Sequence, residues 1–96
     1  MSAALRQTRA VIVNDKGLHA RAAAKFVAKA SEFSSDIHVC CNGERVNANS
    51  IMELLMLACH KGKEIHIEAE GEDATAALDA LGAMIDAGFG ENDETT

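Results

Sequence analysis

Two residues that could carry out phosphoryl chemistry, His19 and Arg21, stand two positions apart in the stretch Gly17-Leu18-His19-Ala20-Arg21. An apolar run ends shortly before this stretch, and a helical pattern begins within it. The first N–H groups of a helix have no partner inside the helix, and its dipole is positive at that end, so helix starts bind anions. A phosphoryl group on His19 would meet the backbone N–H groups of Ala20 and Arg21, and the Arg21 guanidinium would add a charge-assisted contact.

The imidazole of His19 could supply the rest of this chemistry. A neutral imidazole has a lone pair on one ring nitrogen, so that nitrogen can attack phosphorus and later release it. These features predict a reversible phosphoryl carrier rather than an independent catalyst. A histidine at a helix start is more often a structural residue, so this prediction depends on the elements around it.

Composition excludes several classes of protein. With 96 residues, 48% of them hydrophobic, the chain fits one small domain. Its formal net charge of −6 argues against nucleic-acid binding, which needs a basic surface. No apolar run approaches the ~18 residues of a membrane-spanning helix, and residues 1–9 lack the apolar block of a signal peptide. We therefore expect a cytoplasmic monomer without a nucleic-acid or membrane partner.

The three cysteines are Cys40, Cys41 and Cys59. Their number is odd and two are adjacent, which is a poor basis for a disulfide framework, so we expect reduced thiols. Neighbouring residues of a strand point to opposite faces, so one of Cys40 and Cys41 should be buried and the other exposed. A metal or redox module would have to use these cysteines together with His38, His60 and His66. The C-x-x-C and H-x-x-x-H spacings of dedicated sites are absent, so we expect no metal and no cofactor.

The first half of the chain predicts a strand and then a helix. Residues 6–13 end in a β-branched run, which the turn-like residues 14–17 close, so we expect a strand there. From Ala20 onward, apolar residues recur at helical spacing, as at Ala22, Ala23, Phe26, Val27, Ala30 and Phe33. The His19 stretch thus lies between a strand and an amphipathic helix.

Asn42-Gly43 is a strong signal for a tight hairpin between residues 37–41 and residues 44–47. A two-residue loop would pair Cys41 with Glu44, Cys40 with Arg45 and Val39 with Val46. The two valines then share one face of the sheet with Ile37, which is consistent with a buried face.

The second half of the chain predicts a helix, a strand and a last helix. Ser50 precedes Glu53 by three residues, as in a capping box, and an apolar run follows, so we expect a short helix to about His60. Alternation over residues 64–70 predicts a half-buried strand, and residues 73–87 show helical spacing with Asp73 as the cap and Gly88 as the stop. Residues 1–90 form the expected domain, and residues 91–96 form a short acidic tail.

The order of these elements is β-α-β-β-α-β-α. It predicts an α+β fold, a two-layer open-faced β-sandwich in which three helices cover one face of a four-stranded antiparallel sheet. Three motifs stand out along the chain: residues 16–21 (Lys-Gly-Leu-His-Ala-Arg), residues 46–52 (Val-Asn-Ala-Asn-Ser-Ile-Met) and residues 68–73 (Glu-Ala-Glu-Gly-Glu-Asp). With these motifs in the family's order and spacing, the sequence resembles the HPr family, the histidine-containing phosphocarriers of the bacterial phosphoenolpyruvate-dependent phosphotransferase system. Residues 49–57 and 88–91 look more like the nitrogen-related branch than the sugar-transport branch.

The resemblance implies that His19 accepts a phosphoryl group at Nδ1 from enzyme I, which phosphoenolpyruvate phosphorylates, and passes it to an enzyme IIA protein. Arg21 falls on the family's active-site arginine, which would balance the charge of the moving group. Many members have proline directly after this arginine, whereas this chain has Ala22. The alanine keeps helix propensity but loses the fixed φ of proline.

Ser50 falls where the family has a regulatory serine, which in some bacteria an ATP-dependent HPr kinase/phosphorylase modifies. A capping role explains Ser50 equally well, so both roles stay open. A phosphate at this position would add about −2 of charge to the surface that a partner covers and would weaken docking. For that surface we expect four apolar residues of the second helix, Ile51, Met52, Leu55 and Met56, with Leu54 and Leu57 facing inward.

Two other functions remain as alternatives to a carrier. A regulatory protein-binding domain could keep the fold and lose phosphoryl transfer, but the presence of His19 with Arg21 argues against it. A hydrolytic enzyme with His19 as its base lacks an evident nucleophile or acid partner nearby in the sequence.

Overall fold

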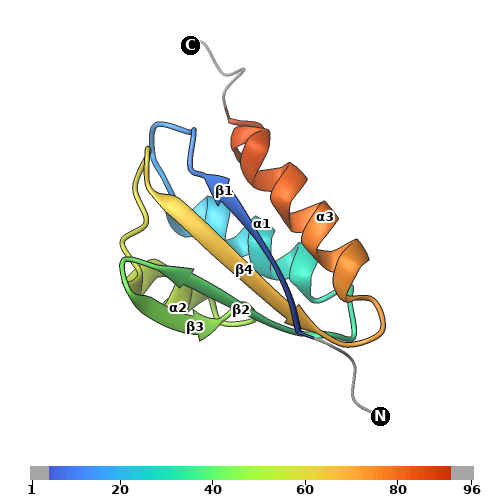
Figure 1. The fold of residues 1–96 in the computed structure, drawn as a ribbon. Coiled ribbons are helices and arrows are strands. Elements are labelled where there is room, and N and C mark those ends of the chain that lie inside the picture. Colours follow the sequence, from blue (N-terminus) through green and yellow to red (C-terminus); the bar gives the residue numbers. More distant parts are fainter. Residues whose placement is uncertain (1–4, 92–96) are drawn as a thin grey trace.

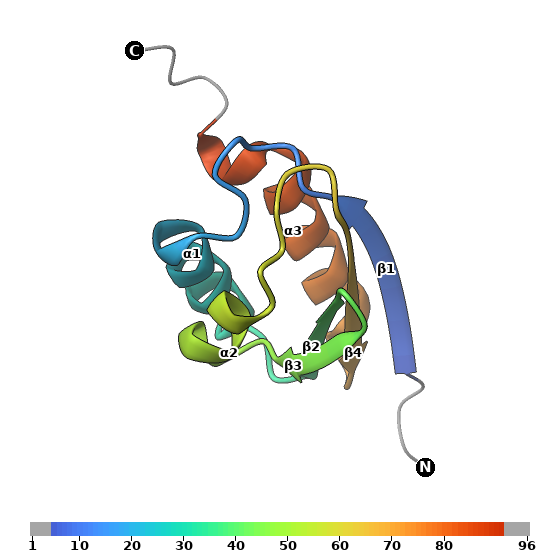
Figure 2. The ribbon, with the colours of Figure 1, turned by 90° about the vertical axis from the view of Figure 1, so that its left-hand side faces the viewer.

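Four antiparallel strands form one sheet in the order β1-β4-β2-β3 in the computed structural model, which describes residues 5–91 (Figure 1). The strands are β1 (Leu5–Val11), β2 (Asp36–Cys41), β3 (Glu44–Asn47) and β4 (Glu64–Glu70). The helices are α1 (Ala20–Ala30), α2 (Ile51–Met56) and α3 (Ala74–Asp86), and a 3-10 turn, η1 (Gly88–Gly90), follows α3. Seen from the side, all three helices lie on one face of the sheet (Figure 2). The predicted fold class and element order are confirmed.

Strand alternation builds the core of the domain. In the central strands β2 and β4, every second residue is buried, and these side chains meet the apolar faces of α1 and α3. The strand residues concerned are Ile37, Val39, Cys41, Ile65, Ile67 and Ala69. Because a slip of one residue would turn all of them toward solvent, this pattern fixes the register of the sheet.

The hairpin between β2 and β3 has the predicted register. Val39 pairs with Val46, and Cys41 pairs with Glu44. Both turn residues have positive φ, 55° at Asn42 and 80° at Gly43, as in the tight turns that match the twist of a two-stranded ribbon.

Helix α2 is shorter than the sequence predicts, since it ends at Met56 rather than near His60. The side-chain amide of Asn42 donates to the carbonyl oxygens of Leu57 at 2.9 Å and Ala58 at 3.2 Å. Ala58 has a φ of +52°, which takes the chain out of the helix. The Asn42 side chain of the hairpin therefore binds the carbonyl oxygens at the end of this helix. The helical spacing of apolar residues cannot predict such a contact between distant segments.

Asp73 occupies the N-cap position of α3, as predicted, but its side chain makes no capping hydrogen bond. Its carboxylate instead accepts hydrogen bonds from the backbone N–H groups and hydroxyls of Ser34 and Ser35. The Ser35 hydroxyl, together with the backbone N–H of Ser34, holds the pKa of the Asp73 carboxyl below its ordinary value. The residue thus ties the segment before β2 to the start of α3.

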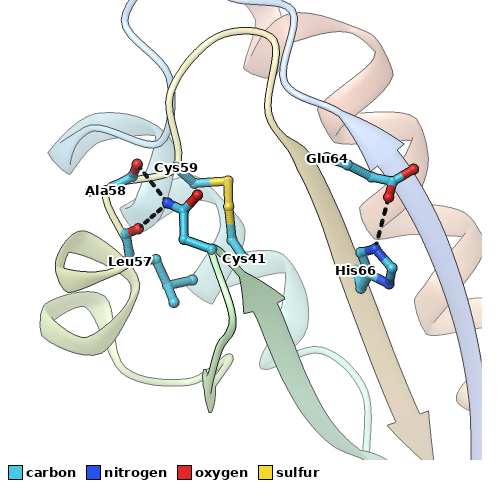
Figure 3. Close-up of a disulfide and its surroundings, with 7 residues drawn as sticks. Cys41, Leu57, Ala58, Cys59, Glu64 and His66 are labelled. Carbon is cyan, nitrogen blue, oxygen red and sulfur yellow. Dashed lines mark hydrogen bonds and ion pairs between the residues drawn. A yellow bond between two sulfur atoms is a disulfide. The ribbon is translucent and has the colours of Figure 1, made fainter.

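The expectation of reduced thiols is wrong for two of the three cysteines. Cys41 and Cys59 form a disulfide (Figure 3), with their Cα atoms 6.2 Å apart. Cys40 is the free cysteine among residues 5–91. Cys41 is buried and Cys40 is half-buried, so the prediction that they face opposite ways is confirmed. Counting cysteines and noting their adjacency could not reveal that the inward face of β2 places Cys41 against Cys59.

Gly17 allows the loop before α1 to lie directly against the segment between α2 and β4. The N–H of Leu18 donates to the carbonyl oxygen of Cys59 at 3.0 Å. Gly17 has a φ of +65°, and a Cβ on it would stand 2.7 Å from the carbonyl oxygen of Cys59 and 3.0 Å from the Cα of His60. Only glycine fits this close backbone contact.

We expect Gly17→Ala to lower the free energy of unfolding by about 2–4 kcal/mol, because a steric clash adds to the cost of the positive φ. Gly43→Ala is the matched control, since Gly43 also has a positive φ but a Cβ on it would meet no atom within 4 Å. This control should lose only about 1 kcal/mol in urea denaturation. Equal losses in the two variants would contradict the close contact.

Candidate functional site

His19 is the N-cap residue of α1, and its backbone is extended, with φ −83° and ψ −178°. Its ring nitrogen Nδ1 accepts a hydrogen bond from the backbone N–H of Arg21 at 3.3 Å. Its carbonyl oxygen accepts from the N–H of Ala23 at 2.8 Å. The imidazole therefore plays the capping role that Ser, Thr, Asp or Asn usually plays. This geometry places Nδ1 at the positive end of the helix, where the sequence predicted an anion site.

The opposite nitrogen of the ring, Nε2, lies 2.5 Å from a carboxylate oxygen of Glu91, the last residue that the structure describes. The other oxygen of Glu91 accepts from the side-chain amide of Asn14 at 3.0 Å. The His19 side chain is 25% exposed and that of Glu91 is 12% exposed, so solvent only partly screens the pair. The imidazole is thus held between the helix start and a carboxylate.

These two contacts select one tautomer of the ring. Burial alone would raise the pKa of the Glu91 carboxyl, but hydrogen bonds from His19 and Asn14 and the nearby charge of Lys16 hold it below its ordinary value. An ionised carboxylate only accepts hydrogen bonds, so Nε2 carries the proton and donates it. The Arg21 N–H only donates, so Nδ1 presents its lone pair. The ring nitrogen that presents a lone pair is therefore the one beside the helix start.

A short network holds Glu91 in place after α3 ends. The Nζ of Lys25 donates to the carbonyl oxygen of Phe89 at 2.8 Å, and the N–H of Glu91 donates to the carbonyl oxygen of Gly88. The Phe89 side chain is buried, although its backbone has a φ of 56°. The turn η1 thus carries the chain back from α3 toward the start of α1.

Asn14 joins the two sides of the site and is fully buried. Its side-chain amide donates both to Glu91 and, at 2.8 Å, to the carbonyl oxygen of Gly17. Sequence reasoning assigned Asn14 to a turn and Glu91 to the acidic tail, so it missed both residues. The contact between His19 and Glu91 joins residues 72 positions apart, so no local sequence pattern could predict it. The rest of the expected tail, residues 92–96, lies outside the described part of the chain.

Arg21 lies in the first turn of α1 with an exposed side chain. Within residues 5–91 its guanidinium makes no hydrogen bond or ion pair. Its backbone N–H points at Nδ1 of His19, so the structure does bring the predicted His19 and Arg21 together. A contact between the guanidinium and a phosphoryl group stays a prediction.

The predicted partner surface on α2 is largely exposed. Met52 is 70% exposed, Met56 73% and Ile51 38%, whereas Leu55 is half-buried and packs against the core. Leu54 and Leu57 face inward, as predicted.

Helix α2 and the His19 loop are neighbours in space. Helix α2 packs against α1, and the segment that follows α2 accepts the Leu18 hydrogen bond (Figure 2). At the start of α2, the Ser50 hydroxyl accepts from the N–H of Glu53 at 3.2 Å, which confirms the cap. The Glu53 carboxylate accepts from the N–H of Asn47 rather than completing the predicted capping box.

Two further observations concern the described residues as a whole. None of the helices within residues 5–91 has the length and apolar character needed to cross a membrane. In the same range, no three His, Cys, Asp or Glu side chains gather into a group that could hold a metal ion.

A family model described as "PTS HPr component phosphorylation site" matches residues 6–87. The chain belongs to the HPr family. The phosphocarrier protein HPr of Neisseria meningitidis is 48% identical over 82 residues, which cover 85% of this chain and 92% of that protein. The phosphocarrier protein NPr of Shewanella violacea is 44% identical over 85 residues, which cover 88% of this chain and 93% of that protein.

A solved structure agrees with this assignment. HPr-C-His from Thermoanaerobacter tengcongensis superposes with a TM-score of 0.86 and 42% sequence identity, over 91% of this chain and 98% of that one. The family resemblance of the sequence is therefore confirmed. Membership places this chain among the phosphocarriers of the phosphotransferase system, whose partners are other proteins of that system.

We expect Glu91→Ala to weaken the tautomer preference of His19, because Nε2 loses its carboxylate acceptor. At pH 8, ¹⁵N chemical shifts of the imidazole should show the proton on Nε2 in the unmodified protein and shared between both nitrogens in the variant. Glu91→Gln is the matched control, since its amide oxygen still accepts a hydrogen bond and should preserve the preference. An unchanged tautomer in Glu91→Ala would contradict the assigned role.

The same contact should make stability depend on pH. The pKa of Glu91 is lower in the folded than in the unfolded chain, where it is near 4.5. Its contribution to the free energy of unfolding is thus fully present above pH 4.5 and is lost as pH falls through the folded value. Urea denaturation of Glu91→Gln should lack this component, and an identical acid dependence in the two proteins would argue against it.

Proposed function

We propose that this protein accepts a phosphoryl group on Nδ1 of His19 from phosphorylated enzyme I, whose group derives from phosphoenolpyruvate, and passes it to an enzyme IIA protein. The observation that carries this proposal is the placement of the imidazole: Nδ1 presents its lone pair at a helix start, and Nε2 donates its proton in a hydrogen bond to the Glu91 carboxylate. Phosphoryl transfer asks a protein mainly for positioning and electrostatics, and this site offers both. Family membership supports the same conclusion.

The transfer step balances without any further reactant. The Nδ1 lone pair attacks the phosphorus of the donor's phosphohistidine, and the donor N–P bond breaks as the new N–P bond forms. The donor nitrogen keeps the electron pair of the broken bond. Nε2 keeps its proton, so the ring of His19 gains positive character, which the carboxylate of Glu91 stabilises. Reversal of the same step on another imidazole delivers the group to the acceptor.

The start of α1 would hold the phosphoryl oxygens. Before transfer, the N–H of Arg21 donates to Nδ1 of His19. After transfer, it can donate instead to an oxygen of the phosphoryl group on Nδ1, and the N–H of Ala20 is the neighbouring donor in the chain. The exposed guanidinium of Arg21 is unconstrained by other partners within residues 5–91 and can follow the charge as it moves between the two proteins.

The α2 surface, Ile51, Met52, Leu55 and Met56, is the proposed docking site for both partners. Met52 and Met56 suit this role because a flexible thioether side chain adapts to different surfaces. A carrier must present one face to its donor and then to its acceptor, so we propose that it acts as a monomer. Its working compartment would be the cytoplasm.

Incubation with phosphoenolpyruvate and enzyme I should give an acid-labile phosphate, and His19→Ala should abolish it because no other described group replaces the nucleophile. Arg21→Ala should slow transfer about 100-fold, the typical loss for one charge-stabilising donor. Single-turnover transfer from phosphorylated enzyme I measures both effects.

Arg9→Ala is the matched control, because Arg9 is an exposed arginine on β1 that pairs with Glu64 and lies on the face of the sheet opposite to the buried Ala10, which the helices cover. Its transfer rate should equal that of the unmodified protein. Equal labelling of His19→Ala would overturn the proposal. An unlabelled, folded parent protein that still binds enzyme I would favour the alternative, a regulatory binding domain without transfer.

We also propose that Ser50 is a regulatory phosphorylation site for an HPr kinase/phosphorylase. The Ser50 hydroxyl stands at the start of α2, directly before the docking surface, and it is only half-buried. A phosphate there would remain compatible with the helix start but would bring about −2 of charge to the face that a partner covers.

Ser50→Asp and Ser50→Asn form a matched pair that separates charge from capping. Both residues are good N-caps, so the two variants should unfold within about 0.5 kcal/mol of each other. Only Ser50→Asp should raise the KM for enzyme I, since it alone adds charge. Equal kinetics in the two variants would leave Ser50 with a capping role, as would the absence of acid-stable phosphate after incubation with ATP and the kinase.

A further inference from the structure

The Cys41–Cys59 disulfide joins two segments that are distant in the sequence and adjacent in the site. Cys41 ends β2, and Cys59 lies in the segment between α2 and β4, with a sequence separation of 18 (Figure 3). Both residues are buried, at 3% and 2% exposure. The hydrogen bonds from the side-chain amide of Asn42 to the carbonyl oxygens of Leu57 and Ala58 join the same two segments.

Cys59 also holds the loop that carries His19. Its carbonyl oxygen accepts the hydrogen bond from the N–H of Leu18, the residue directly before His19. The same carbonyl oxygen is the atom that a Cβ on Gly17 would strike. One residue therefore carries both the covalent crosslink and the backbone support of the phosphoryl site.

We propose that Cys41 and Cys59 form a reversible thiol–disulfide site, exchanging with small-molecule disulfides such as oxidised glutathione, and that its redox state sets how firmly the His19 loop is held. The functional part rests on the phosphoryl carriage proposed above. In a reducing cytoplasm, disulfides are usually transient and regulatory rather than permanent. A crosslink placed against the phosphoryl loop is suited to such a role.

The exchange balances with oxidised glutathione as the oxidant. One deprotonated sulfur of the pair attacks the glutathione disulfide, whose S–S bond breaks to release one glutathione thiolate and leave a mixed disulfide. The second sulfur, also deprotonated, attacks the mixed disulfide, so that the Cys41–Cys59 bond forms and a second glutathione thiolate leaves. The two released thiolates take up the two protons that the protein thiols lost. The protein is oxidised by two electrons, and one glutathione disulfide is reduced.

Cys40 does not compete as a partner in this exchange. The side chains of Cys40 and Cys41 lie on opposite faces of the sheet, and the Cys40 sulfur lies 3.9 Å from a carboxylate oxygen of Glu68. Burial, followed by the charge of Glu68, raises the pKa of its thiol and disfavours the reactive thiolate. Because the sulfurs of the pair are buried, their exchange requires local opening of the segment around Cys59, which keeps it slow.

Reduction should loosen the support of His19 without unfolding the domain. The crosslink restricts the segment that accepts the Leu18 hydrogen bond, so its loss increases the fraction of time for which that bond is open. We expect the amide of Leu18 to exchange with solvent about tenfold or more faster in the reduced protein. Phosphoryl transfer from enzyme I should become about threefold or more slower, because the nucleophile is less well positioned.

The experiment compares protein oxidised with glutathione disulfide and protein reduced with dithiothreitol, each freed of reagent before assay. Thiol titration after denaturation should find one thiol in the oxidised form, Cys40, and three in the reduced form, since the chain has three cysteines. Hydrogen exchange at Leu18 and single-turnover phosphoryl transfer are then measured on both. Cys40→Ala should keep the full difference, and the Cys41→Ala/Cys59→Ala double variant should behave like the reduced protein under both treatments.

Three thiols after oxidation, or stable glutathione adducts in place of the crosslink, would overturn the proposal. Equal Leu18 exchange and equal transfer rates in the two forms would overturn it as well, and this comparison needs no variant to fold. If neither form accepted a phosphoryl group, the proposed carrier function would fail. The Leu18 exchange rates would still decide whether the disulfide controls the His19 loop.

Discussion

The close backbone contact between Gly17-Leu18 and Cys59 is what holds the site together. The loop that follows β1 and the loop that precedes β4 lie in contact at this point. Gly17 leaves room for the carbonyl oxygen of Cys59, and the N–H of Leu18 donates a hydrogen bond to the same oxygen. This contact fixes the backbone directly before His19, the N-cap residue of α1. The core of this small domain contains few large side chains, since the chain has only three Phe and no Trp or Tyr. The contact with the Cys59 carbonyl oxygen therefore contributes to holding the His19 loop in place.

In the proposed mechanism, His19 depends on the different partners that its two ring nitrogens meet. A donor that is part of the helix start faces one nitrogen, and an acceptor from the far end of the chain faces the other. This division leaves a lone pair where an anion is favoured and a proton where a carboxylate can balance the charge that develops on the ring. The proposed transfer uses residues that a small domain can provide and leaves the remaining groups to the partner protein.

The sequence predicted the parts of this structure that are local or periodic. The hairpin at Asn42-Gly43, the strand alternation of β4 and the helix start after His19 all follow from short-range rules, and the structure has them. It did not predict the contacts between segments that are distant in the chain. Asn42 ends α2, Asp73 binds Ser34 and Ser35, Glu91 contacts His19, and Cys41 bonds to Cys59, and each pairing depends on tertiary structure. The histidine of the site was thus predictable, whereas the groups that orient it were not.

The nitrogen of His19 that faces the helix start should be the one that carries the phosphoryl group. Heteronuclear NMR of the ¹⁵N-labelled, phosphorylated protein decides this, because ¹⁵N–³¹P coupling identifies the bonded atom. We expect coupling of phosphorus to Nδ1 of His19, with the proton retained on Nε2. Coupling to Nε2, or phosphorus on any other residue, would show that the helix start does not select the nucleophile.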